Sequence, residues 1–259
     1  MVALISSFHL VLFRFPFFNA VNFCHVLYFQ IGTEPNETTS IGSRPVTRWH
    51  QTFDVGHVPN SVVPKVFMGV ACDLRDDAHG LVTTDCSLSK NVPFLFSGHP
   101  ATKLDVGYRL SRSGLAVAYG HDVEFLGPLV SDISYVNGSA TLNVTYANVS
   151  SIDLRSPDGF DVLHLFLYLS TRVILHVVVI FQVCCGGIIC AKYGRWYTSP
   201  IIEKNGLTVT ISINSSCVHE QVNAIRYLWR DTPCDFKKAP IYSSTDPDLP
   251  SPPYFKYFN

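Results

Sequence analysis

The 259-residue chain has a formal net charge of −1, and only 15% of its residues are charged. It therefore lacks the basic field with which proteins bind nucleic acid, and this class of partner is excluded. Its length allows one large domain or two ordinary ones with a buried core. The apolar residues concentrate in residues 1–31 and 162–183, which have fewer charged residues than the rest of the chain.

Residues 1–31 are apolar and aromatic but are interrupted by Arg14, Pro16 and several polar side chains. A signal peptide has a basic start, a compact apolar core and a small-residue cleavage site, and this pattern is missing. A membrane-spanning helix needs about 20 uninterrupted apolar residues, which are missing as well. We interpret residues 1–31 as an atypical N-terminal segment of the kind that mis-splicing produces.

Residues 32–120 have the pattern of an α/β domain. A polar loop with a short helix at most precedes residues 62–74, an apolar, β-branched run typical of a buried strand. Asp73 lies at the end of this run, and in open α/β sheets the chemistry gathers at the carboxyl ends of strands. Asp76 and Asp77 follow in an acidic turn and are alternative carboxylates.

An amphipathic helix is expected to begin just after His99. Pro100 suits a first helical turn, where its missing N–H costs nothing. The apolar residues at helical spacing are expected to be buried: Leu104, Tyr108, Leu110 and Leu115. The charged residues between them are expected to face solvent: Lys103, Asp105, Arg109 and Arg112. A histidine held at a helix start is placed as a general base requires, although a capping or exposed histidine is the more common case.

Residues 121–259 change to short alternating runs separated by Asn-Gly and Ser-rich turns. This pattern predicts an antiparallel sheet with one solvent-exposed face, with short alternating runs within residues 121–154 and further strands over residues 207–213 and 222–229. The alternating residues are Ile133 and Tyr135 in one run and Leu142, Val144 and Tyr146 in another. The proline-rich tail, residues 246–259, is expected to lie along the surface.

Residues 162–183 interrupt this β-rich half with a long apolar run. The run could cross a membrane, but a central Arg172 costs about 2.5–3.5 kcal/mol on insertion scales. We interpret residues 162–181 as an apolar insert, which makes a membrane partner the weaker interpretation. Residues 78–92 are interpreted as an insert in the same way.

Cysteines and glycosylation triplets both indicate the secretory pathway. The eight cysteines are Cys24, Cys72, Cys86, Cys184, Cys185, Cys190, Cys217 and Cys234. The N-x-[ST] triplets begin at Asn36, Asn137, Asn143, Asn148 and Asn214. The cysteines are compatible with disulfides, whereas the spacings of structural zinc sites are missing. We therefore expect an oxidising, glycosylating compartment.

Four blocks, in one order along the chain, carry a resemblance to a known family. They are residues 48–60 (RWHQTFDVGHVPN), 67–74 (FMGVACDL), 99–120 (HPATKLDVGYRLSRSGLAVAYG) and 224–242 (AIRYLWRDTPCDFKKAPIY). Together they resemble the animal sialate O-acetylesterases, and the chain resembles the C-terminal portion of such an enzyme.

This resemblance implies a secreted or lysosomal serine esterase of the SGNH-like class, which removes acetyl groups from sialic acids or sialoglycans without a metal or organic cofactor. The implied fold class is α/β plus all-β. Residues 32–120 would be the end of a three-layer α/β esterase domain, and residues 121–259 an antiparallel β-sandwich-like domain. His99 is carried over as the general base, within Ser97–Lys103, and Asp73 as the carboxylate that orients it.

The chain also departs from the family pattern. The Gly-x-Ser block of the nucleophile has no counterpart, because Gly42-Ser43 and Gly138-Ser139 lie in loop or sequon context. We therefore expect this chain to lack the serine nucleophile and to be inactive alone. The family's cysteine after Cys234 is replaced by Lys238-Ala239, which puts one bridge of the tail in question. The alternatives are a non-catalytic secreted β-sandwich module and a membrane-anchored glycoprotein; the oligomeric state is left open.

Overall fold

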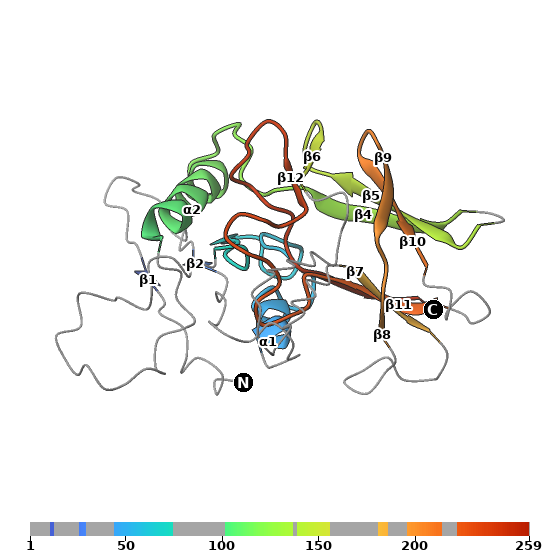
Figure 1. Ribbon diagram of the computed structural model, residues 1–259. Coiled ribbons are helices and arrows are strands. Elements are labelled where there is room, and N and C mark those ends of the chain that lie inside the picture. Colours follow the sequence, from blue (N-terminus) through green and yellow to red (C-terminus); the bar gives the residue numbers. More distant parts are fainter. Residues whose placement is uncertain are drawn as a thin grey trace, which may run out of the picture.

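The structure, a computed structural model, describes residues 11–12, 26–29, 44–74, 102–136, 139–155, 181–185, 196–213 and 222–258. Figure 1 shows helix α2 at one side of the molecule and the strands of the C-terminal half at the other. The short helix α1 (Arg44–His50) agrees with the expectation of a short helix at most in the polar loop.

A small mixed sheet with one helix on it makes up the α/β part. Its strands are β1 (Val11–Leu12), β2 (Val26–Phe29) and β3 (Val66–Gly69), in the order β1-β2-β3. Strands β2 and β3 are parallel, and α2 (Lys103–Val117) packs against β3. The expected strand over residues 62–74 is therefore shorter than predicted, and residues 70–74 continue it as buried, irregular chain.

The side of α2 that is buried differs from the expected one. Val106, Arg109 and Ser113 are buried, whereas Leu104 is 85% exposed and Leu115 is also exposed. The prediction of burial was therefore wrong for Leu104, Tyr108 and Leu115, whereas Leu110 is partly buried. The prediction that Arg109 faces solvent was wrong as well.

The residues of β3 that contact α2 explain which side of the helix is buried. Gly69 allows close approach, because a Cβ built there would lie 3.4 Å from Cβ of Arg109. The Ser113 hydroxyl donates to the Met68 carbonyl oxygen at 2.8 Å, which satisfies a buried backbone acceptor. Arg109, Ser113 and the partly buried Leu110 therefore make this contact.

Three antiparallel sheets make up the C-terminal half. The first contains, in spatial order, β4 (Leu129–Tyr135), β5 (Thr141–Ala147), β10 (Thr208–Ser212) and β9 (Ile201–Asn205). The second contains β13 (Tyr254–Tyr257), β11 (Val222–Tyr227), β7 (Phe181–Cys185) and β8 (Trp196–Thr198). A third pairs β12 (Ile241–Ser243) with β6 (Ile152–Leu154).

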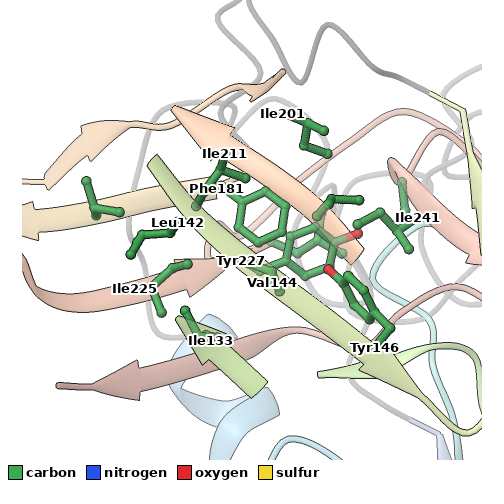
Figure 2. Packing of buried hydrophobic residues seen from close by; sticks show 14 of the residues in the cluster. Ile133, Leu142, Val144, Tyr146, Phe181, Ile201, Ile211, Ile225, Tyr227 and Ile241 are labelled. Atoms are coloured by element: carbon green, nitrogen blue, oxygen red, sulfur yellow. The ribbon is translucent and has the colours of Figure 1, made fainter. Parts of the chain in front are cut away.

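The main core lies between the two four-stranded sheets. Figure 2 shows Leu142, Val144 and Ile211 from the first sheet packed with Phe181 and Tyr227 from the second. Alternate residues of β5 and β10 are buried, as the period-2 pattern predicted. The expected antiparallel, sandwich-like arrangement is confirmed.

The proline-rich tail was predicted wrongly as a surface segment. Ser251 is fully buried, and its backbone N–H donates to the Ile241 carbonyl oxygen at 2.9 Å. Residues 254–257 then form β13, which pairs with β11 in register Ala224↔Tyr257. The prolines suit this path because β13 follows them at the edge of its sheet.

Most of the apolar run at residues 162–183 lies outside the described residues. Its last three residues belong to β7, where Val183 is fully buried and pairs with Ile225. Among the described residues, no helix is long and apolar enough to cross a membrane.

Candidate active-site region around Asp73

Of the two predicted site residues, only Asp73 can be placed. His99 lies outside the described residues, as do Asp76 and Asp77, the alternative carboxylates. The first described residue after His99 is Thr102, and α2 begins at the next position. The contacts of Asp73 and of the helix that follows His99 therefore define the region.

Asp73 is completely buried four residues beyond the end of β3. Its Oδ1 accepts a hydrogen bond from Nη1 of Arg109 at 2.5 Å, and its Oδ2 accepts one from Nη2 at 2.9 Å. The Tyr242 hydroxyl also donates to Oδ2, at 2.6 Å. A bidentate ion pair of this kind has the geometry that a buried charge needs to offset its desolvation.

Arg109 has its other donors satisfied by backbone oxygens. Nε donates to the Asp248 carbonyl oxygen at 2.7 Å, and Nη1 also donates to that of Val70 at 2.7 Å. Burial alone would lower the pKa of Arg109, but the Asp73 carboxylate more than offsets this effect, so the pKa lies above its ordinary value. The guanidinium is therefore a fixed positive charge that ties α2 to both β3 and the tail.

Tyr242 brings the C-terminal half to the same carboxylate. It lies in β12 and is fully buried. Burial raises the pKa of its hydroxyl, and the neighbouring Asp73 charge raises it further, so Tyr242 is a neutral donor at every ordinary pH. A backbone hydrogen bond from the Lys237 N–H to the Asp73 carbonyl oxygen, at 2.7 Å, adds a further link between the two halves of the chain. We call this group of contacts around Asp73, made by Arg109, Tyr242 and Lys237, the junction.

A second group of polar contacts holds the exposed side of α2. The Lys237 ammonium lies 2.7 Å from Oδ1 of both Asp105 and Asp248. The Tyr108 hydroxyl donates to Oδ2 of Asp246 at 2.7 Å. These pairs are partly exposed, so each contributes little, but together they fix the helix against the tail.

The contacts define what Asp73 can do chemically. A carboxylate offers about four acceptor positions, and Arg109 and Tyr242 occupy three of them. Among the contacts made by described residues, one position of Oδ1 is left, which is what an imidazole N–H would need. The orienting role of Asp73 stays a prediction, and its observed role is to anchor the helix that follows His99.

Sequence reasoning missed Arg109 and Tyr242 as parts of this region. Both lie in blocks that carry the family resemblance, which was the available signal. Periodicity could not reveal them, because their common partner lies far away in the sequence. Within the described ranges, no group of three or more His, Cys, Asp or Glu side chains is arranged to hold a metal ion.

Comparisons with known proteins agree with the resemblance. Residues 131–258 match the family model described as "Sialate O-acetylesterase C-terminal domain". Sialate O-acetylesterase of Mus musculus is 32% identical over 211 residues, which are 81% of this chain and 31% of the relative. The protein of the same name from Homo sapiens is 29% identical over 229 residues, 88% of this chain and 36% of the relative. The chain thus spans about a third of the length of these relatives.

A solved structure supports the fold. The crystal structure of a carbohydrate acetylesterase from Xanthomonas citri matches with a TM-score of 0.55 and 18% sequence identity. The match covers 89% of this chain and 40% of that one. At this identity the likeness concerns the fold alone.

Proposed function

We propose that this chain, which matches the sialate O-acetylesterase C-terminal domain over residues 131–258 and the mouse enzyme over 81% of its own length, is the C-terminal portion of an esterase that removes O-acetyl groups from sialic acids. The observation that carries this proposal is the junction at Asp73. A carboxylate just beyond a parallel strand is held beside the helix that directly follows His99. An open α/β esterase sheet places its catalytic groups at this kind of position.

The proposed chemistry is acyl transfer to a serine. The serine hydroxyl attacks the acetyl carbonyl carbon while His99 accepts its proton, and Asp73 holds the imidazole in the required tautomer. Backbone amides stabilise the oxyanion that forms. We place the serine outside the blocks of this chain, so the isolated chain is expected to be inactive. The substrate is an O-acetylated sialic acid or sialoglycan.

The finer fold and the compartment belong to the same proposal. We assign residues 32–120, which include β3 and α2, to the end of a three-layer, SGNH-like α/β domain, and the parallel pairing of β3 with β2 supports this assignment. We assign the protein to the secretory pathway, as a secreted or lysosomal glycoprotein. The disulfide-bonded state of Cys184 and Cys185 supports this assignment.

A hybrid enzyme tests the proposal. The matching C-terminal region of the mouse relative is replaced by residues 44–258 of this chain, and acetate release from O-acetylated sialic acid is measured. We expect activity in the hybrid and none in the mouse protein truncated at the same point. The substitution His99→Ala should lower kcat by at least about 10³-fold, and Asp73→Asn by a comparable factor, because triad members act as a unit.

The matched control is His121→Ala. His121 is an exposed histidine just beyond α2, and its removal should leave the activity within about twofold. A hybrid that folds, by circular dichroism, but releases no acetate would refute the proposed function. Equal activities of the His99→Ala and His121→Ala hybrids would refute the role of His99.

A further inference from the structure

Two buried cysteines lie on opposite sides of the junction between the two halves of the chain. Cys72 precedes Asp73 and is fully buried, and Cys234, in the loop between β11 and β12, is 3% exposed. Both are free thiols in the structure and belong to the same buried cluster. Neither takes part in the proposed ester chemistry.

The backbone around the two cysteines brings them close together. The hydrogen bond from the Lys237 N–H to the Asp73 carbonyl oxygen joins the segment after Cys72 to the segment after Cys234. The Arg48 guanidinium donates to the Arg230 and Asp231 carbonyl oxygens, which precede Cys234, at 2.6 and 2.7 Å. It also interacts electrostatically with Cys72.

Electrostatic effects agree with this proximity. Both thiols lie within interaction range of the Arg48 guanidinium and of the Tyr227 hydroxyl. The pKa of Cys234 is raised by burial first, then by the Asp73 carboxylate and by the neighbouring Cys72 thiol. The two sulfur atoms therefore share one buried environment.

We propose that Cys72 and Cys234 form a disulfide bond that links the α/β part to the C-terminal β-rich half. In this step the two S–H bonds break and one S–S bond forms. Two electrons and two protons pass to a disulfide oxidant, such as oxidised glutathione, which leaves as two thiols. The bond is compatible with the compartment that the bonded Cys184 and Cys185 indicate.

The bond has to form before the junction closes. Thiol–disulfide exchange requires a thiolate and access to the oxidant. Burial raises the pKa of Cys72 to about 12, and that of Cys234 is also raised by burial, so the folded thiols are protonated and shielded. The link is therefore a permanent staple made during folding, and not a reversible switch.

Peptide mapping of the wild-type chain tests the bond directly. The chain is expressed through a secretory host, denatured without reductant, blocked with iodoacetamide and digested with trypsin. We expect a linked species of peptides 66–75 (VFMGVACDLR) and 231–237 (DTPCDFK), which disappears after reduction. Recovery of both peptides in alkylated form would overturn the proposal.

Two further measurements distinguish the effect of the Cys72–Cys234 disulfide from that of the other cysteines. Reduction should lower the melting temperature more in the wild type than in the Cys72→Ala/Cys234→Ala variant, which keeps Cys184 and Cys185. Equal shifts in the two proteins would contradict the proposal.

Oxidised glutathione should yield the linked peptide when added during refolding of reduced chain, but not when added to the folded reduced chain. Linkage in the folded chain would refute the requirement for formation during folding.

Discussion

Replacing Arg109 by methionine tests the junction most directly. The substitution keeps an unbranched side chain of similar length in α2 but removes all the hydrogen bonds that the guanidinium donates. The Asp73 carboxylate then remains fully buried, with Tyr242 as its remaining donor among the contacts described. The wild-type arrangement is thus converted into a buried charge without a counter-charge.

The expected loss follows from this geometry. Breaking a buried ion pair by removing one partner costs about 3–5 kcal/mol, because the other charge stays desolvated. The Asp248 and Val70 carbonyl oxygens also lose their donor from Arg109, and an unsatisfied buried acceptor costs about 1–3 kcal/mol. We expect Arg109→Met to lower the free energy of unfolding by at least about 3 kcal/mol.

Urea denaturation of a double-mutant cycle measures the coupling. The variants are Arg109→Met, Asp73→Asn and the combination of both, with far-UV circular dichroism as the readout. The double variant should be more stable than Arg109→Met alone, because the neutral amide relieves the unpaired charge. Arg112→Met is the matched control, since Arg112 lies on the same helix and is only partly buried, and its loss should cost less than about 1 kcal/mol.

Equal losses for Arg109→Met and Arg112→Met would refute the reasoning, because the burial of the ion pair would then have no energetic consequence. The reasoning would also be contradicted if the double variant lost as much free energy of unfolding as the two single variants lose together. In that case Arg109 and Asp73 would act independently, which their two direct hydrogen bonds exclude.

Three other predictions concern buried tyrosines and glycines. Burial raises the pKa values of Tyr227 and Tyr242 in the folded chain above 10, so their contribution to stability is fully present below pH 10 and declines above it. Absorbance at 295 nm should show them ionising only with unfolding, and ionisation in the folded chain would contradict their burial. Gly127→Ala should destabilise by at least about 1–3 kcal/mol in urea, because its Cβ would overlap the Pro250 backbone, and an unchanged midpoint would refute this contact. A Cβ at Gly107 of α2 would meet no other atom, so Gly107→Ala should raise the free energy of unfolding by about 0.5–1 kcal/mol in urea. A lower free energy of unfolding would show that another group fills this space.

The sequence predicted those elements whose pattern is local. Strands β5 and β10 follow the alternation that a one-sided sheet imposes on neighbouring residues, so their alternating side chains revealed them. Strand β11 lies within the predicted run at residues 222–229, although its residues 224–227 are all buried. Helix α2 was found because its pattern is local as well. Its orientation was missed because periodicity counts apolar side chains, whereas α2 packs through Arg109, whose charge is neutralised by a residue outside the helix.

The tail and the site depended on distant partners. Proline content predicted a surface path for the tail, but it carries no information about the long-range contacts that bury Ser251. Asp73 was selected for its position after a strand, and the structure adds that Arg109 and Tyr242 occupy its carboxylate. Such long-range pairs have no signature in a single sequence.

The four blocks that carry the family resemblance meet at this junction. Arg48 of the first block donates to the Asp231 carbonyl oxygen of the fourth, and Asp73 of the second binds Arg109 of the third. Tyr242 of the fourth block donates to the same Asp73 carboxylate. The C-terminal half is therefore an integral part of this junction, because the Tyr242 hydroxyl and the Lys237 N–H bind Asp73 and the Asp248 carbonyl oxygen binds Arg109 of α2.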